Sequence, residues 1–333
     1  MTLEAPPFNS PPRSEPPARS MIELEGLTKR FGNRLAVDHL DLRVEAGMIC
    51  GLLGHNGAGK STAIGMMLGQ VWPTTGRVTV FGRDVTSERS EALKEVGAIF
   101  ESPVFYDYLS GYRNLEILSH YTAPTSRQRI LEVVEWVGLS GREHSLVRTY
   151  SHGMRARLAL AQALLPQPRL LVLDEPGDGL DPEGIHEIRR TILRLHREMG
   201  MTILLSSHLL NEVEQLCTHL VVMRQGRKVF DGTLAEARAR RKLVRLDTTD
   251  FDSAFALLRE ANLAIEKHPG GRLTLAPGAA TEEVARLLVN HHLPVRELVR
   301  EEMTLEDFYL ELMKHAATAP QENRSSNPGL APG

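Results

Sequence analysis

The sequence predicts an α/β fold with a mainly parallel central sheet, followed by a small α+β domain. Three short apolar runs at residues 48–53, 170–173 and 202–205 are typical of buried strands. A helical stretch at residues 183–198 separates the last two runs, and strands that alternate with helices build parallel sheets. At 333 residues the chain is long enough for two domains, because single cores stop growing near ~250 residues.

Composition divides the chain further. Ile22 to Glu25 alternates like a strand, so the globular part begins with β structure. A basic cluster that starts at Arg238 marks the domain boundary, and beyond it short strands and helices alternate in a way that suggests a ferredoxin-like domain. The predicted segments are residues 1–20, a disordered tail rich in proline; 21–237, the main domain; 238–316, the small α+β domain; and 317–333, a second disordered tail.

Bulk properties exclude several classes of protein. A content of 42% hydrophobic and 24% charged residues is that of a globular protein, and a net charge of −3 argues against a nucleic-acid partner. Cys50 and Cys217 are too few for a disulfide framework, which favours the cytosol. No apolar run reaches the about 18 residues of a membrane-spanning helix, so we expect the chain not to cross a bilayer.

A glycine-rich segment after the first apolar run matches the phosphate-binding pattern G-x-x-x-x-G-K-[ST]. Its glycines let backbone N–H groups face phosphate oxygens at the start of a helix. Lys60 is expected to reach the β- and γ-phosphates and Ser61 to hold Mg²⁺, which makes ATP and Mg²⁺ the predicted cofactors; the alternative is a chance match. The predicted nucleotide-binding residues are Gly54, His55, Asn56, Gly57, Ala58, Gly59, Lys60, Ser61 and Thr62.

Two carboxylates, Asp174 and Glu175, end the second apolar run. Buried acids need a counter-ion, so we expect Asp174 to help hold Mg²⁺ and Glu175 to polarise the attacking water. The alternative is that both acids only cap a helix.

Three further motifs accompany these two, and together they resemble the ATP-binding cassette (ABC) family over roughly residues 22–235. They are Tyr150-Ser151-His152-Gly153-Met154, Gly179-Leu180-Asp181-Pro182 and Ser206-Ser207-His208. The resemblance implies a P-loop NTPase with a RecA-like core, an antiparallel β subdomain and a helical subdomain.

The resemblance also implies roles for single residues. Ser151 and Gly153 would close over the nucleotide of a second protomer, Asp181 would be the D-loop, His208 would contact the γ-phosphate, and Phe31 would stack on adenine. From the residues alone, Ser151 can cap a helix that begins near Gly153, and capping is its alternative role. A packed histidine is the alternative for His208, and an ordinary aromatic is the alternative for Phe31.

The sequence departs from the family pattern in two motifs. In the signature, His152 and Met154 replace a glycine and a glutamine. In the Q-loop, Glu101 stands where the family has a glutamine that contacts Mg²⁺ and faces the membrane subunit. This variant loop resembles the bacitracin and lantibiotic type of export ATPase, although Glu101 can also be drift within any exporter.

The leading hypothesis is therefore an ATPase subunit that drives a separate membrane permease, with export of a drug or peptide antibiotic as its task. We expect a homodimer, or a heterodimer with a second such ATPase, on the cytoplasmic face of the membrane. The rival is a non-transport ABC ATPase that acts on ribosomes or DNA. A P-loop nucleotide kinase would leave Ser151 to Gly153 unexplained.

Overall fold

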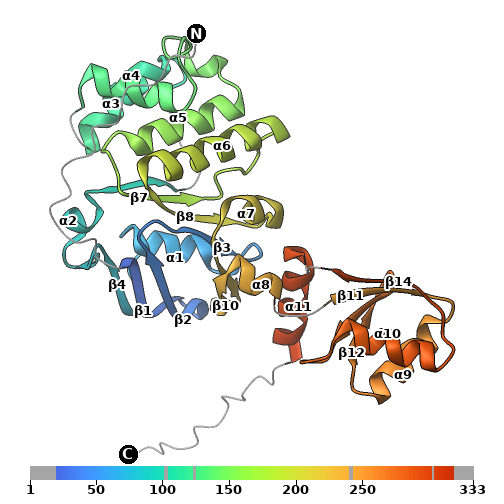
Figure 1. The fold of residues 1–333 in the computed structure, drawn as a ribbon. Coiled ribbons are helices and arrows are strands. Elements are labelled where there is room, and N and C mark those ends of the chain that lie inside the picture. The colour runs from blue at the N-terminus through green and yellow to red at the C-terminus, as the bar shows by residue number, and fades with distance from the viewer. Residues whose placement is uncertain (1–19, 101–103, 123–124, 240–242, 302–303, 319–333) are drawn as a thin grey trace, which may run out of the picture. The chain divides into compact units, whose positions relative to one another are not determined.

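The computed structural model describes residues 20–100, 104–122, 125–239, 243–301 and 304–318. Packing divides the chain between Glu236 and Ala237 into two compact units, each with its own core (Figure 1). Helix α8 (Leu234–Ala239) crosses this division. Within the part of the chain that the structure describes, no helix combines the length and the apolar character needed to span a membrane.

The first unit is built on a six-stranded sheet. Neighbouring strands β3, β8, β7 and β6 run parallel, β9 is parallel to β3, and β10 closes the edge as an antiparallel hairpin partner. Strands β3, β7 and β8 are buried along their whole length, which explains their continuous apolar sequences. In spatial order the strands are β10 (Arg227–Thr233), β9 (His219–Arg224), β3 (Ile49–Leu53), β8 (Thr202–Ser207), β7 (Leu170–Asp174) and β6 (Val96–Ile99).

A second, antiparallel sheet precedes and follows β3 in the sequence. Its strands in spatial order are β2 (Arg34–Glu45), β1 (Ser20–Phe31), β4 (Thr75–Val80) and β5 (Arg83–Asp84). Helix α1 (Lys60–Met67) shares one core with both sheets, and its Ala63, Ile64 and Met66 are buried. This packing holds the first turn of α1, where the phosphate-binding residues lie, between two sheets.

The first unit also contains helices α2 to α7 and one 3₁₀ helix. Helix α6 is amphipathic and buries Ile188, Ile192 and Leu195. Helices α3, α4 and α5 pack against one another as a helical subdomain (Figure 1). The bounds are α2 (Arg89–Leu93), α3 (Gly111–Thr122), α4 (Arg127–Trp136), the 3₁₀ helix η1 (Val147–Thr149), α5 (His152–Leu164), α6 (Pro182–Met199) and α7 (Leu210–Leu216).

The second unit is a four-stranded antiparallel sheet with the order β12-β13-β11-β14. Helices α9 and α10 pack on this sheet, and the chain order β-α-β-β-α-β with this strand order is the ferredoxin-like arrangement. The bounds are β11 (Leu243–Thr248), α9 (Phe251–Glu260), β12 (Ala264–His268), β13 (Arg272–Leu275), α10 (Thr281–Asn290), β14 (Val295–Glu301) and α11 (Leu305–Thr318).

The predicted α/β fold with an antiparallel β subdomain, a helical subdomain and a small α+β unit is confirmed. Two predicted boundaries differ from the structure at the ends. Strand β1 begins at Ser20, inside the predicted first tail, and α11 runs to Thr318, beyond residue 316. Residues 1–19 and 319–333, which make up the rest of the two predicted tails, lie outside the described residues.

Candidate functional site

The phosphate-binding loop joins β3 to α1 in a conformation that depends on glycine. Gly57 and Gly59 have φ of 82° and 105°, in the region that other residues avoid. A Cβ at Gly59 would also lie 2.5 Å from the carbonyl oxygen of Ala36 on β2. The loop therefore needs glycine at position 59 for both its backbone angle and its close approach to the neighbouring sheet.

The loop lines a cavity of about 290 Å³. Most of the predicted nucleotide-binding residues of the loop face it, whereas Gly54 and Ala58 are buried beneath it. The lining residues are Arg34, Ala36, His55, Asn56, Gly57, Gly59, Lys60, Ser61, Thr62 and Glu175. Arg34 is the one cation of this lining that the sequence analysis missed.

Lys60 lies in the wall of the cavity with only 4% of its side chain exposed. Its Nζ donates a hydrogen bond to the carbonyl oxygen of Gly54 at 2.7 Å and lies 3.1 Å from Oε1 of Glu175. The second carboxylate oxygen of Glu175, Oε2, contacts Nδ1 of His208. The structure thus brings the three predicted catalytic residues into one line of direct contacts.

This line follows from the sheet topology. Lys60 follows β3, Glu175 follows β7 and His208 follows β8, and these strands are neighbours in the order β3-β8-β7. The carboxyl ends of parallel strands meet at one edge of the sheet, where open α/β sheets bind ligands. Sequence separation is therefore no obstacle to contact between the three side chains.

Glu175 is held in an unusual backbone conformation and an unusual charge environment. Its φ of 50° is uncommon for a residue with a side chain. Burial raises the pKa of this carboxyl, but hydrogen bonds and charge from His208 and Lys60 outweigh burial and leave the pKa below its ordinary value. The group is therefore held as a carboxylate.

Ser206, at the end of β8, ties the two acidic residues to their neighbouring strand. Its hydroxyl donates to Oδ1 of Asp174 and accepts the backbone N–H of Glu175 at 2.9 Å. The sequence analysis gave Ser206 no role. A hydroxyl at the buried end of the strand that leads to His208 was the available signal for this contact.

Asp174 and Ser61 offer the kind of oxygen donors that Mg²⁺ prefers. Asp174 ends β7 with 8% of its surface exposed, and Ser61 lies in the exposed cavity lining. In the described ranges, no group of three or more His, Cys, Asp or Glu residues could hold a metal ion by itself. The donor set fits Mg²⁺, which takes few protein ligands and shares the rest with water and phosphate.

The signature and D-loop residues form a second group. Ser151 begins α5, and its hydroxyl accepts the N–H of Met154 at 3.2 Å, which confirms the capping prediction. Asp181 caps α6 in the same way through Gly184 N at 2.9 Å. A Cβ at Gly153 would lie 3.5 Å from the Cα of Gly184, so the first turns of the two helices are in contact.

Phe31 and Glu101 are the remaining predicted site residues. Phe31 is 49% exposed at the end of β1, where Lys29 Nζ lies 4.8 Å from its ring centroid and Arg34 faces it across a two-residue turn. Glu101 lies outside the described residues, so its contacts are not described.

Known proteins are similar to this chain in sequence and fold. A family model described as "ABC transporter" matches residues 37–178, and one described as "AAA domain, putative AbiEii toxin, Type IV TA system" matches residues 144–214. The bacitracin transport ATP-binding protein BcrA of Bacillus licheniformis is 37% identical over 299 residues, which cover 88% of this chain and 97% of that protein. The chain belongs to the ABC transporter ATP-binding proteins.

Two further similarities agree with this membership. The daunorubicin/doxorubicin resistance ATP-binding protein DrrA of Streptomyces peucetius is 33% identical over 318 residues, which cover 92% of this chain and 94% of that protein. The solved structure of CbiO1 from Clostridium perfringens is 25% identical with a TM-score of 0.61, and the match covers 66% of this chain and 91% of that one.

Membership of this family establishes the general activity of the chain. The chain binds ATP and hydrolyses it to drive transport, as ABC ATP-binding subunits do together with a membrane permease. The names of these relatives give no support to the rival reading of a ribosome- or DNA-acting ATPase.

Proposed function

We propose that the chain powers the export of a peptide antibiotic or a related drug through a separate permease, from the cytoplasmic face of the membrane. The observation that carries this proposal is similarity to BcrA and DrrA over 88% and 92% of the chain, which includes most of the second unit as well as the cassette. The variant Q-loop with Glu101 adds to it. Glu101 would contact Mg²⁺ and face the permease.

The hydrolytic roles follow from the contacts among Lys60, Glu175 and His208. Phosphates that enter the cavity offer Lys60 a stronger anionic partner than Glu175, so Lys60 moves from the carboxylate to the β- and γ-phosphates. The freed Glu175 polarises a water molecule for in-line attack on the γ-phosphate. His208 binds the γ-phosphate through Nε2, which has no hydrogen-bond partner among the described residues.

Ser61 and Asp174, with Glu101, would hold Mg²⁺, which offsets charge between the β- and γ-phosphates. The loop residues 54–62 supply backbone N–H groups to the same phosphates. Phe31 would stack on adenine through the exposed part of its ring.

Arg34 adds a residue to this nucleotide site. Its Nη2 lies 3.7 Å from the position that a Cβ would take at Gly57, and the described residues offer its guanidinium no hydrogen bond or ion pair. An unpaired guanidinium beside a phosphate-binding loop is suited to a phosphate oxygen. We therefore include Arg34 among the residues that bind the phosphates of ATP.

Ser151, Gly153 and Asp181 would complete the site of a second protomer. Their hydroxyl, carboxylate and backbone groups gather at the contact between α5 and α6, and none of them lines the phosphate cavity of their own chain. A homodimer is the simplest assembly because the chain carries one complete set of motifs. A heterodimer with a second ABC ATPase is the other outcome of the same test.

Drug susceptibility tests the export proposal. The chain is expressed with a candidate permease, sought among the neighbouring reading frames, in a host that lacks a comparable exporter, and inhibitory concentrations of bacitracin, a lantibiotic and daunorubicin are measured. Protection against at least one compound, lost in the Lys60→Ala variant, is expected. Equal susceptibility with and without active chain for all three compounds would contradict the proposal.

A further inference from the structure

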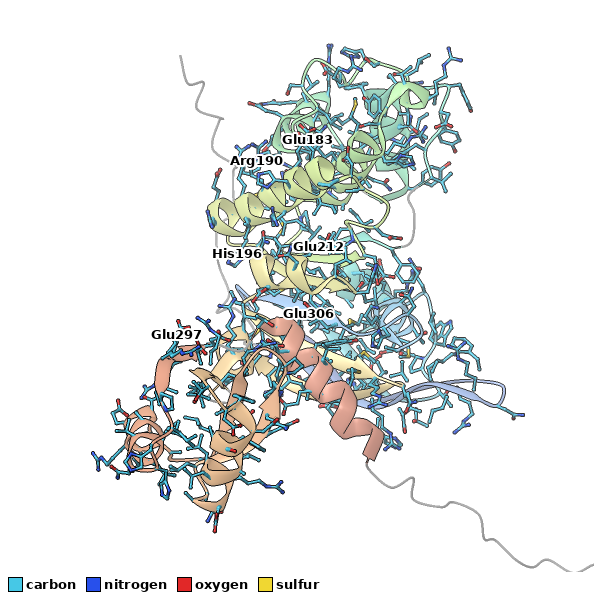
Figure 2. All side chains as sticks on the ribbon, turned by 90° about the vertical axis from the view of Figure 1, so that its right-hand side faces the viewer. Glu183, Arg190, His196, Glu212, Glu297 and Glu306 are labelled. Carbon is cyan, nitrogen blue, oxygen red and sulfur yellow. The ribbon has the colours of Figure 1, made fainter. Side chains whose placement is uncertain are left out.

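Glu212 lies on α7 (Figure 2). Its carboxylate contacts the end of β8 and the loop that follows β7, and it does not line the phosphate cavity. Its Oε2 accepts a hydrogen bond from the hydroxyl of Ser207 at 3.0 Å. Its Oε1 is buried and has no hydrogen-bond partner among the described residues. A carboxylate oxygen that is buried without a partner is costly, so the position of Glu212 calls for a reason other than stability.

The partnerless oxygen lies against Gly177, two residues after Glu175. A Cβ at Gly177 would be 2.4 Å from Oε1 of Glu212, so the carboxylate occupies the space that the absent side chain leaves. The φ of Gly177 is not in the left-handed region, and its backbone does not itself require glycine. Here glycine supplies room for Glu212.

The other contact of Glu212 lies directly before His208. The Ser207 hydroxyl that donates to Glu212 also accepts the N–H of Leu209 at 2.9 Å, so Glu212 and Ser207 together fix the backbone on both sides of His208. Glu212 therefore contacts the loop that carries His208 and the loop that follows Glu175.

The charges around Glu212 come from both loops and from neighbouring helices. Burial raises its pKa, and the charge of Glu175 adds to this, whereas the Ser207 hydrogen bond and the charges of His208 and Arg189 lower it. The net effect is a pKa above the ordinary value. Burial raises the pKa of Cys217, directly after α7, and the charges of Cys50 and Glu212 raise it further.

We propose that Glu212 is a positioning residue that sets the distance between His208 and Glu175 by bridging Ser207 and Gly177. The proposal rests on the roles given above to Glu175 and His208. Glu212 acts through the shape and hydrogen bonding of its carboxyl group, and it has no contact with nucleotide.

Steady-state ATP hydrolysis by the full chain tests the proposal. Glu212→Ala is expected to lower kcat about tenfold while KM for ATP stays within about twofold, because the cavity lining is untouched. Glu212→Gln should recover most of kcat, because its amide oxygen can still accept from Ser207. Glu214→Ala, on the same helix, is the matched control and should behave as the native chain does.

Two double variants separate positioning from general destabilisation. Ser207→Ala removes the same hydrogen bond, so Ser207→Ala with Glu212→Ala should lose little beyond Glu212→Ala alone. In the second double variant, adding Glu212→Ala to His208→Ala should lower kcat little further, because Glu212 acts through the position of His208. If Glu212→Ala does not fold, Ser207→Ala alone serves as the test of the kcat loss.

The proposal is overturned if Glu212→Ala and Ser207→Ala keep native kcat, or if their losses multiply with that of His208→Ala. Native activity in His208→Ala itself would instead count against the proposed role of His208. The failure of the positioning role and the failure of the catalytic assignment are therefore distinct results.

Discussion

Two groups of site residues differ in their contacts. The nucleotide-side group is Lys60, Glu175 and His208, and the signature-side group is Ser151 and Asp181. Glu175 contacts both Lys60 and His208; the Lys60 side chain is buried, whereas 37% of the His208 side chain is exposed. Ser151 and Asp181 are exposed and contact only backbone N–H groups of their own helices. Among the described residues, Ser151 and Asp181 make no other side-chain hydrogen bond or ion pair, and neither contacts the first group through one. This difference is what a site shared between two protomers requires.

The largest expected effect is the loss of ATP hydrolysis when Glu175, in the nucleotide-side group, is changed. Glu175→Gln should keep ATP binding and lower hydrolysis by about 10²- to 10⁴-fold, because the water loses the carboxylate that polarises it. Phosphate release and ATP binding are measured on the same preparation. Glu183→Gln, at the exposed start of α6, is the control (Figure 2). Native turnover in Glu175→Gln would remove Glu175 from the mechanism.

A complementation experiment tests whether Ser151 completes the nucleotide site of the opposite protomer. On a Glu175→Gln background, chains with Lys60→Ala and chains with Ser151→Arg should each fail to form an ATP-dependent dimer, since every composite site is damaged. In the mixture, one of the two sites of a mixed dimer joins an intact Lys60 to an intact Ser151. ATP-dependent dimers occupied at one site are expected, and size-exclusion chromatography with bound-nucleotide analysis measures them.

The parent Glu175→Gln chain provides the positive control for that experiment. If the parent dimerises with ATP and the mixture does not, Ser151 is a helix cap only and the comparison between the two groups loses its functional meaning. If the parent itself dimerises only with a second ABC ATPase, the assembly is a heterodimer.

Sequence alone predicted the residues that belong to contiguous motifs. The phosphate loop, Asp174, Glu175 and His208 are recognisable because a strand, a turn and a short polar segment follow one another in the chain. The strands of the central sheet were predictable for a similar reason, since their burial makes them continuously apolar.

Contacts between distant segments were not predictable. Ser206 bonds to Asp174 and Glu175 across 31 or 32 residues of sequence, and Arg34 reaches the cavity because the β1–β2 hairpin lies beside the loop. The left-handed backbone of Glu175 also leaves no mark in the sequence, since a non-glycine residue occupies it. Such features depend on strand order and loop geometry, which no local pattern encodes.

Arg34 sharpens the comparison because it is exposed like Ser151 and Asp181 but lies beside the phosphate-binding loop, where its guanidinium has no ion pair among the described residues. Arg34→Ala should weaken ATP and ADP binding by about 5- to 20-fold and leave adenosine binding unchanged, because a phosphate contact is lost. Arg43→Ala is the matched control: Arg43 lies on the same strand β2, is exposed, and pairs with Glu23. Calorimetric titration measures all three ligands, and equal affinities in Arg34→Ala and the native chain would exclude the contact.

The last expected effect is on the stability of the chain itself, measured without nucleotide. Glu175 neutralises the buried Lys60, so Glu175→Gln should lower the free energy of unfolding by about 1–3 kcal/mol near neutral pH. The pKa of Glu175 is lower in the folded chain than its ordinary value of 4.5, so the unfolded chain binds the proton more readily. The stabilisation is therefore complete above about pH 4.5 and is lost as the pH falls through the lowered pKa of the folded state. Urea unfolding of both chains at several pH values, without nucleotide or phosphate, gives the difference directly, and the other acidic groups cancel because both chains share them. A difference that stays constant on acidification would mean that the contact between Lys60 and Glu175 does not stabilise the resting site, and the two groups of residues would then differ in position but not in energy.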